Sequence, residues 1–311
     1  MPLDPSTAVV LRALEAAGAS ALASGTPESA RAYARAGRRE PALLVQVAAT
    51  ENARIPGPGG YLDVRIYRPA TAGPRPTVVY FHGGGFVIGD LDSHDDHCRL
   101  ICRDVAAVVM SVAYRLAPEA RFPKPLHDAV AATRWAAHNI HHLGADPDRL
   151  AVAGDSAGGN LAAAVAIALA GTPIRLAAQM LAYPKVDFSD HPYPSRGENA
   201  EGYYLTAAMM QWFSDHYLDP ESYGDPWASV ILAEPHQNLA PAVIGVGEYD
   251  LLRDEVLAYA VRLEAAGVPV SRHCFDGLVH GFFGMSLLSP AAAQAVATMN
   301  QDLRELLDVA R

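Results

Sequence analysis

The stretch Val152-Ala153-Gly154-Asp155-Ser156-Ala157-Gly158-Gly159-Asn160 decides the fold of this chain. The apolar run 150–153 predicts a short buried strand, and the alanine-rich run 161–170 predicts a helix. Between them, Gly154-x-Ser156-x-Gly158 fits a sharp strand-to-helix turn with a serine at its apex. A side chain at Gly154 or Gly158 would clash there with the neighbouring chain. The five residues alone fit an ordinary glycine-rich turn equally well. The flanking strand and helix favour the nucleophile turn.

The composition bounds the class of protein. The chain has 311 residues, half of them hydrophobic, which is enough for one large domain or one domain with a smaller addition. Its net charge is −10, and lysine occurs only as Lys124 and Lys185. Because no basic cluster is present, nucleic-acid binding is not expected.

Cysteine usage and the N-terminus predict a cytoplasmic protein. Cys98, Cys102 and Cys274 are too few, and odd in number, for a disulfide framework. The first residues lack the basic start and apolar core of a signal peptide. No apolar run is long enough to span a bilayer, so stable membrane insertion is not expected.

Strand and helix patterns alternate along most of the chain. This alternation predicts an α/β fold with a mostly parallel central sheet flanked by helices. Residues 1–42 are predicted to form helices outside the sheet. Residues 43–184 and 236–311 would form the core, and 185–235 a cap insertion over one edge of the sheet, in one compact unit.

Strands are predicted at 43–49, 61–67, 77–81, 107–112, 150–153, 176–183, 242–246 and 268–275, with a hairpin connection over 56–60 between the first two. Helices are predicted at 98–105, 125–142, 161–170, 207–217, 254–266 and 290–309.

Four groups of polar or glycine residues follow predicted strands. They are His82-Gly83-Gly84-Gly85, Ser156, Asp250 and His280. In open sheets of this kind, ligands gather at the carboxyl ends of the strands. The sequence therefore predicts that these four groups meet in one site.

The residue types point to nucleophilic catalysis. A serine hydroxyl is a weak nucleophile unless a base accepts its proton, and His280 is the best candidate for that base. A carboxylate must orient the base, and we assign this role to Asp250. Asp254 and Glu255 are rivals, but they fit better as acids in the first turn of the next helix.

A negatively charged intermediate would need preplaced hydrogen-bond donors. Gly84 and Gly85 have no side chains to prevent their N–H groups from turning inward. Ala157 would add a third N–H at the start of its helix. These three residues are the predicted oxyanion hole.

The motifs together resemble those of the hormone-sensitive-lipase-like esterases, a group of α/β-hydrolases in which the triad runs Ser, Asp, His along the chain. The matching residues are His82-Gly83-Gly84-Gly85-Phe86, Tyr114-Arg115-Leu116-Ala117-Pro118-Glu119, Gly154 to Asn160, Tyr183-Pro184 and His280-Gly281-Phe282, together with Ser93-His94-Asp95 and Cys98-Arg99. The resemblance covers about residues 77–285. One departure lies at the acid, where the family often has Asp-Pro-Leu and this chain has Asp250-Leu251-Leu252.

The resemblance implies a serine carboxylesterase that hydrolyses short- to medium-chain acyl esters through an acyl-enzyme. Its partner would be a small-molecule ester, with no metal and no cofactor. It also implies that the N-terminal helices and the 185–235 insertion form a helical cap that lines the acyl pocket. The expected substrate-binding residues are Phe86, Tyr183, Tyr203, Trp212 and Phe282.

Several alternatives accompany these expectations. A metal site among residues 94–98 and Cys102 is disfavoured, because the same residues have counterparts in a metal-free fold. Asp155 and His82 are expected to hold the turn and the glycine loop.

A non-catalytic binding protein on the same fold is a second hypothesis, although the presence of a complete triad favours catalysis. Lactone or amide cleavage and acyl transfer would use the same triad. Exposed edge strands make a homodimer plausible.

Overall fold

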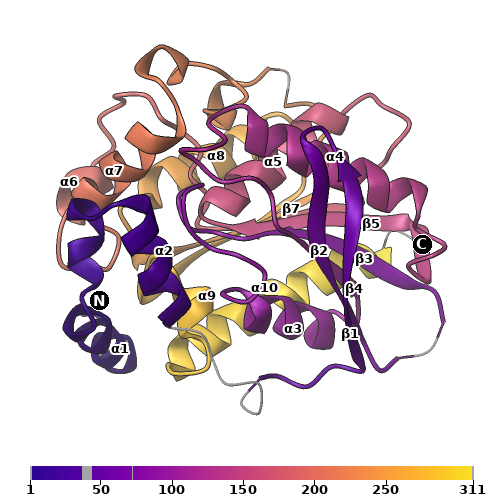
Figure 1. Cartoon of the computed structure of the whole chain (residues 1–311), viewed down its shortest axis with the longest axis horizontal. Coiled ribbons are helices and arrows are strands. Elements are labelled where there is room, and N and C mark those ends of the chain that lie inside the picture. The colour runs from indigo at the N-terminus through magenta and orange to yellow at the C-terminus, as the bar shows by residue number, and fades with distance from the viewer. Residues whose placement is uncertain (1, 37–43, 72, 235, 310–311) are drawn as a thin grey trace.

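An eight-stranded sheet organises the computed structural model, which describes residues 2–36, 44–71, 73–234 and 236–309 (Figure 1). The strands lie in the order β1-β2-β4-β3-β5-β6-β7-β8. β2 is antiparallel to both of its neighbours, and all other pairs are parallel. The strands are β1 (Ala49–Gly57), β2 (Gly60–Arg68), β3 (Arg75–Phe81), β4 (Val108–Val112), β5 (Ala145–Asp155), β6 (Ala178–Ala182), β7 (Ala242–Tyr249) and β8 (Val270–Val279).

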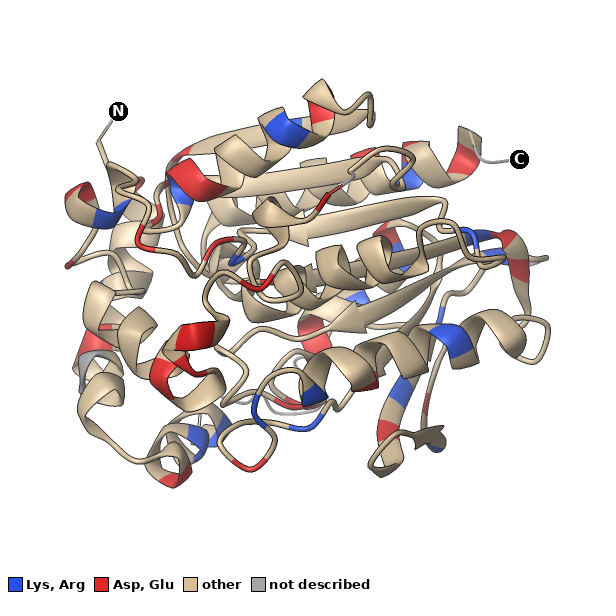
Figure 2. Ribbon diagram, turned by 90° about the horizontal axis from the view of Figure 1, so that it is seen from above, with Lys and Arg blue, Asp and Glu red and all other residues tan. Residues whose placement is uncertain are grey.

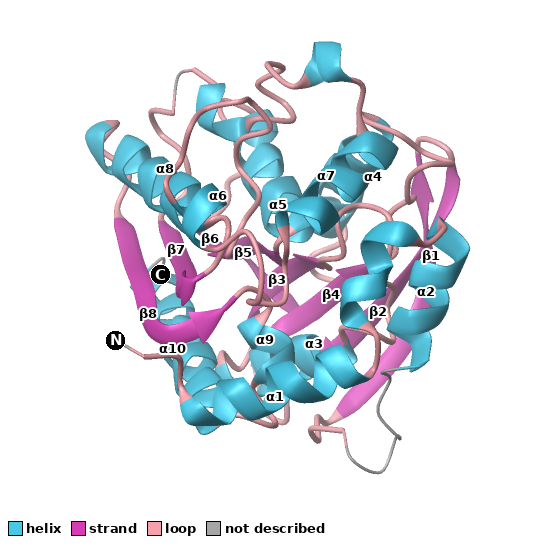
Figure 3. Ribbon diagram, turned by 90° about the vertical axis from the view of Figure 1, so that its left-hand side faces the viewer, coloured by secondary structure: helices cyan, strands magenta, loops and turns pink. Residues whose placement is uncertain are grey.

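Helices cover both faces of this sheet (Figure 3). One face carries α4 (Lys124–His138), α5 (Ala157–Leu169) and α8 (Arg253–Ala265). The other carries α3 (Asp95–Asp104), α9 (Phe282–Met285) and α10 (Pro290–Val309). Every residue of β4 and β6 is buried, as expected for strands covered on both sides. Both strands are therefore apolar apart from one buried polar residue each, Ser111 in β4 and Gln179 in β6.

A further group of segments lies to one side of the sheet (Figure 1). It contains α1 (Pro5–Ala16), η1 (Ala19–Ser24), α2 (Pro27–Ala36), α6 (Ser195–Glu198) and α7 (Ala207–Tyr217), with the short turns η3 (Pro220–Ser222) and η4 (Val230–Leu232) in the same insertion as α6 and α7. The indole N–H of Trp212 on α7 donates to the Gly25 carbonyl at 3.2 Å. The N-terminal segment and the stretch between β6 and β7 are therefore in direct contact.

The first predicted strand is wrong. The strand lies at Ala49–Gly57 and not at 43–49, and Leu43 itself lies outside the described residues. The hairpin turn between the first two strands consists of residues 58 and 59 alone. Pro56 and Gly57 belong to the strand and pair with Tyr61 and Gly60. β1 is an exposed edge strand in which Ile55 is the buried residue, so it carries no apolar alternation by which it could be found.

The other predicted strands and helices are present, most of them with shifted ends. α7 and α10 have the predicted bounds, whereas the helix predicted at 125–142 ends at His138. α6 and α9, each of four residues, were not predicted. Charged residues gather on the peripheral helices, loops and strand ends, and the inner strands carry few of them (Figure 2). In the described part of the chain, no helix is both long enough and apolar enough to cross a membrane.

Candidate active site

Ser156 occupies the turn between β5 and α5. Its φ of 53° lies in the left-handed region, which a residue with a side chain adopts only when its surroundings enforce it. A Cβ on Gly154 would lie 2.3 Å from the carbonyl carbon of Gly158, so the two glycines allow the strand and the helix to approach. The backbone N–H of Ser156 donates to the Ala182 carbonyl at 2.8 Å and fixes the turn against β6.

The structure brings Ser156, His280 and Asp250 together. His280 Nε2 lies 3.0 Å from Ser156 Oγ, and His280 Nδ1 lies 2.8 Å from Asp250 Oδ2. Asp250 directly follows β7, and His280 directly follows β8. The other carboxylate oxygen of the buried Asp250 accepts the Leu252 N–H at 2.8 Å. The imidazole can therefore carry its proton on Nδ1 and donate a hydrogen bond from there to Asp250. Nε2 is then free to accept a hydrogen bond from the Ser156 hydroxyl.

Three backbone N–H groups beside Ser156 are unused. Among the described residues, none accepts a hydrogen bond from the N–H of Gly84, Gly85 or Ala157. All three residues line the same cavity as Ser156. Gly84 and Gly85 have φ values of +113° and +58°, which favour glycine, and a Cβ on Gly84 would also lie 2.3 Å from the Ile88 carbonyl oxygen. Free donors of this kind can stabilise an oxygen that becomes negative.

Asp155 holds the glycine loop against the serine turn. Its Oδ1 accepts the Gly83 N–H at 2.9 Å and the Tyr80 hydroxyl at 2.6 Å. Burial alone would raise the pKa of Asp155, but the nearby His94 and His97 and the Tyr80 hydroxyl lower it well below its ordinary value. This carboxylate is therefore charged and locally bonded, and it draws the start of the loop toward Ser156.

His82 shapes the other side of the loop. Its Nδ1 lies 2.8 Å from the Gly83 carbonyl oxygen, and its ring stacks on Tyr114 with 4.4 Å between the ring centres. The Tyr114 hydroxyl donates to the His82 carbonyl at 2.6 Å. Burial, followed by the neighbouring His94, lowers the pKa of His82 to about 4. A neutral, buried imidazole supports the loop without taking part in proton transfer.

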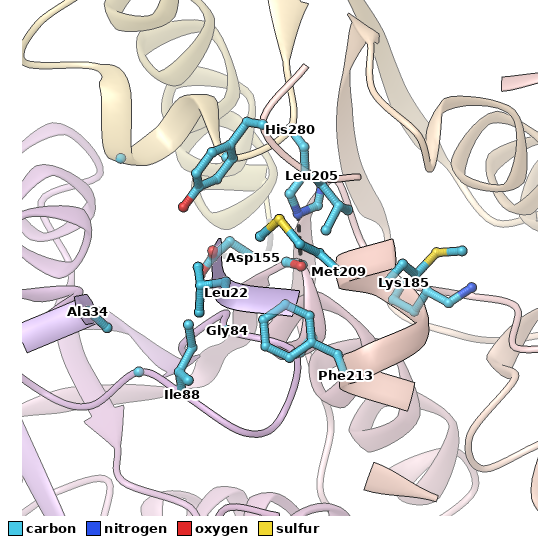
Figure 4. A pocket seen from close by; sticks show the side chains of 18 of the residues that line it. Leu22, Ala34, Gly84, Ile88, Asp155, Lys185, Leu205, Met209, Phe213 and His280 are labelled. Atoms are coloured by element: carbon cyan, nitrogen blue, oxygen red, sulfur yellow. Dashed lines mark hydrogen bonds between the residues drawn. The ribbon is translucent and has the colours of Figure 1, made fainter. Parts of the chain in front are cut away.

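A cavity of about 460 Å³ opens beside the Ser156–His280 pair (Figure 4). Phe86 and Tyr183, two of the five predicted substrate-binding residues, line it. Its apolar lining comes mainly from residues that the sequence reasoning missed, namely Leu14, Leu22, Tyr33, Ile88, Phe188, Leu205, Met209, Met210 and Phe213. The apolar periodicity of 207–217 could have indicated a buried face there, but not which cavity that face would line.

The other three predicted substrate-binding residues are not among the described residues that line the cavity; they are Tyr203, Trp212 and Phe282. The Tyr203 ring packs against that of Tyr249 in a tilted arrangement, with ring centres 4.8 Å apart. The Trp212 side chain is directed toward the N-terminal segment, where its indole N–H donates a hydrogen bond to the Gly25 carbonyl. Phe282 is fully buried and packs edge-on against Tyr183, 5.0 Å between ring centres. Phe282 thus supports a cavity residue from behind.

One group of described residues has the donor atoms of a metal site. Ligand atoms of His94, His97 and Asp155 lie within 4.8 Å of one another. Ligands around a tetrahedral zinc ion lie roughly 3.3 Å apart, given bonds of about 2.0 Å. Asp155 already accepts two hydrogen bonds, and His97 Nδ1 lies 3.2 Å from the Tyr80 hydroxyl. The cluster is thus explained as a hydrogen-bonded support of the glycine loop.

Comparison with known proteins identifies relatives across nearly the whole chain. Residues 78–284 match a family described as having the alpha/beta hydrolase fold. The chain is 40% identical over 316 residues to carboxylic ester hydrolase LipN of Mycobacterium tuberculosis, covering 97% of this chain and 82% of that relative. It is 45% identical over 249 residues to esterase LipI of the same organism, covering 78% and 77% of the two chains.

Solved structures agree with this relationship. An esterase from Pyrobaculum calidifontis superposes with a TM-score of 0.89 at 36% identity, covering 98% of this chain and 99% of that one. The carboxylesterase EstE1, from a metagenomic library, superposes with a TM-score of 0.85 at 40% identity, covering 91% and 98%.

Proposed function

Since the chain belongs to the hormone-sensitive-lipase-like family of carboxylesterases and is a carboxylic ester hydrolase, we propose that Ser156 is its nucleophile, His280 its base and Asp250 its acid. The observation that carries this proposal is the continuous chain of contacts from Ser156 Oγ through His280 to Asp250, at 3.0 and 2.8 Å. The base lies within hydrogen-bond reach of both the nucleophile and the orienting carboxylate.

The reaction starts with attack by Ser156. His280 Nε2 takes the hydroxyl proton while Oγ bonds to the ester carbonyl carbon, and the carbonyl oxygen becomes negative. The N–H groups of Gly84, Gly85 and Ala157 donate to that oxygen. Each such donor contributes roughly 3–4 kcal/mol to the stability of the transition state. Asp250 stabilises the imidazolium cation that forms on His280.

Collapse of the intermediate releases the alcohol. The bond from the carbonyl carbon to the alkoxy oxygen breaks, and His280 gives its proton to that oxygen. The acyl group remains on Ser156. A water molecule then gives a proton to His280 and attacks the acyl carbon. The second collapse returns the proton to Ser156 and releases the carboxylic acid.

The cavity supports esters with short to medium acyl chains as substrates. Its volume of about 460 Å³ and its largely apolar wall suit a small apolar group. We assign Phe86 and Tyr183 to direct substrate contact, and Tyr203, Trp212 and Phe282 to support behind the wall. The cap consists of residues 1–42 together with 185–235. It supplies Leu14 and Leu22 from the first segment and Met209 and Phe213 from the second.

Two further assignments rest on the sequence. The cytoplasm is the proposed location, in keeping with three free cysteines, of which Cys98 and Cys102 are buried. A homodimer is the proposed assembly, since β1 and β8 form the two edges of the sheet. Sedimentation velocity of the purified protein tests the assembly directly.

The experiment that tests the function is hydrolysis of 4-nitrophenyl esters from acetate to palmitate by wild type and Ser156→Ala. We expect the short and medium esters to be cleaved by wild type and cleavage to fall to background in the variant. Full activity of a correctly folded Ser156→Ala protein would contradict the assignment of the nucleophile.

A further inference from the structure

Lys185 is a cation in the wall of an otherwise largely apolar cavity. Among the described residues that line the cavity, it is the only lysine or arginine. It is adjacent to the reaction centre, because its backbone N–H donates to the Ser156 carbonyl at 3.2 Å. The side chain is 9% exposed, and its ammonium group lies 4.9 Å from the centre of the Phe188 ring, which also lines the cavity.

Glu255 neutralises this cation from outside the cavity. Its fully buried carboxylate lies 3.1 and 3.2 Å from Lys185 Nζ. In the part of the chain that the structure describes, no other carboxylate lies within 4 Å of that ammonium group. The ammonium also donates to the Asp187 carbonyl. Figure 4 shows the Lys185 side chain directed away from His280.

The position of the Glu255 carboxylate is fixed by several donors. Its Oε1 accepts the N–H groups of Val186 at 3.0 Å and Asp187 at 3.2 Å. Its Oε2 accepts Arg196 Nη2 at 2.7 Å. A carboxylate held by this many donors cannot turn away from Lys185.

We propose that Glu255 determines the charge specificity of the ester hydrolase, because it neutralises Lys185 and holds the ammonium group away from the acyl chain. The cavity then favours neutral acyl groups over acyl groups that end in a carboxylate. Without Glu255, neither Lys185 nor Arg196 would have a carboxylate partner among the residues that the structure describes, and Lys185 could pair with an anionic substrate. This inference rests on the proposed active site, since it places the acyl chain in the cavity beside Ser156.

A matched pair of esters tests it. 4-Nitrophenyl hexanoate and mono-4-nitrophenyl adipate have the same acyl length, and only the adipate ends in a carboxylate. The ratio of their kcat/KM values is measured at pH 6.5, because burial lowers the pKa of Lys185 and a lower pH keeps more of its charge. We expect wild type to favour hexanoate, and Glu255→Gln to shift the ratio toward adipate by about tenfold, the size expected for one partly shielded charge pair.

Two variants control the experiment. Lys185→Met combined with Glu255→Gln removes the freed ammonium group and should abolish most of the shift. Glu264→Gln, an exposed acid on the same helix, should leave the ratio at the wild-type value. The ratio compares two substrates on one protein, so it does not depend on the fraction of protein that folds.

The proposal has outcomes that would overturn it. One is a wild type that cleaves both esters equally well, a result that requires no variant to fold. The other is a Glu255→Gln ratio unchanged from wild type, or a shift that persists in the double variant. Loss of hexanoate cleavage in Ser156→Ala tests the active site separately, so failure of one assignment is not mistaken for failure of the other.

Discussion

A Cβ on Gly158 would lie 1.9 Å from the carbonyl oxygen of Phe81. Phe81 ends β3, the strand that leads into the glycine loop, and Gly158 lies in the first turn of α5. The absence of a side chain at this position lets the helix that follows Ser156 approach the strand that precedes Gly84 and Gly85. This close approach helps to bring Ser156 and the N–H groups of Gly84 and Gly85 to the same cavity.

Gly158→Ala should be strongly destabilising. The new methyl group would meet backbone atoms of Phe81 and His82, which cannot rotate away. We expect the free energy of unfolding to fall by about 3 kcal/mol or more, at the upper end of the range for overpacking. Urea denaturation measures the change. Gly224→Ala is the control, because a Cβ there meets nothing within 4 Å, and a loss of equal size in that variant would contradict the steric explanation.

Asp250→Asn should reduce kcat by about 10⁴ while the fold is retained, because an amide favours the wrong histidine tautomer. The matched comparison is Asp254→Asn. Asp254 accepts the Ser195 N–H at 2.7 Å and pairs with Arg253, so its role is to hold α6 in place. Steady-state kinetics on 4-nitrophenyl butyrate decide between the two acids. A large loss in Asp254→Asn alone would move the catalytic acid to that position.

Two buried histidines should make the protein labile to acid. Burial, followed by His94, lowers the pKa of His82 to about 4 and that of His97 to about 3. An unfolded histidine titrates near pH 6.5, so below that pH the unfolded state binds more protons than the folded state. The free energy of unfolding therefore falls as pH falls from about 6.5 toward 4, by roughly 2 kcal/mol for each histidine at pH 5.

Guanidinium denaturation at pH 7.5 and pH 5.0 measures this dependence. His97→Asn, which can keep a hydrogen bond to Tyr80, should lose about half of the difference that the two histidines produce. His138→Asn, at an exposed position on α4, should keep all of it. An unchanged pH dependence in His97→Asn would show that this histidine is not held neutral in the folded protein.

Phe213→Ala should extend the range of acyl chains. The Phe213 ring lies against the glycine loop, since a Cβ on Gly85 would lie 2.2 Å from it. Removing the ring opens space for about two more methylenes, which contribute roughly 1.6 kcal/mol when buried. We expect kcat/KM for octanoate relative to butyrate to rise by about tenfold. Trp212→Ala, one residue earlier but bonded to Gly25, should change this ratio much less.

Sequence reasoning predicted that the three residues of the proposed triad meet, because each of them follows a strand. Ser156, Asp250 and His280 directly follow β5, β7 and β8, and parallel strands place their carboxyl ends together. The apolar runs of these strands are visible in the sequence, so their order along the chain is enough to predict that the three residues meet.

The cavity wall could not be predicted in the same way. Met209 and Phe213 are four residues apart on α7 and face the cavity, whereas Trp212 on the same helix faces the N-terminal segment. Helical periodicity groups these residues but does not state which side of the helix meets the core. The exposed strand β1 was misplaced for a related reason, because an edge strand with little buried surface leaves no apolar pattern.

The most direct test of the account is the site of acylation. Wild type is mixed with 4-nitrophenyl butyrate, quenched in acid during the first turnovers and digested for peptide mass spectrometry. We predict one butyryl group, on the peptide that contains Ser156, and none in Ser156→Ala. A butyryl group on another residue, or turnover with no acylated peptide when release of nitrophenol shows a burst, would contradict nucleophilic attack by Ser156.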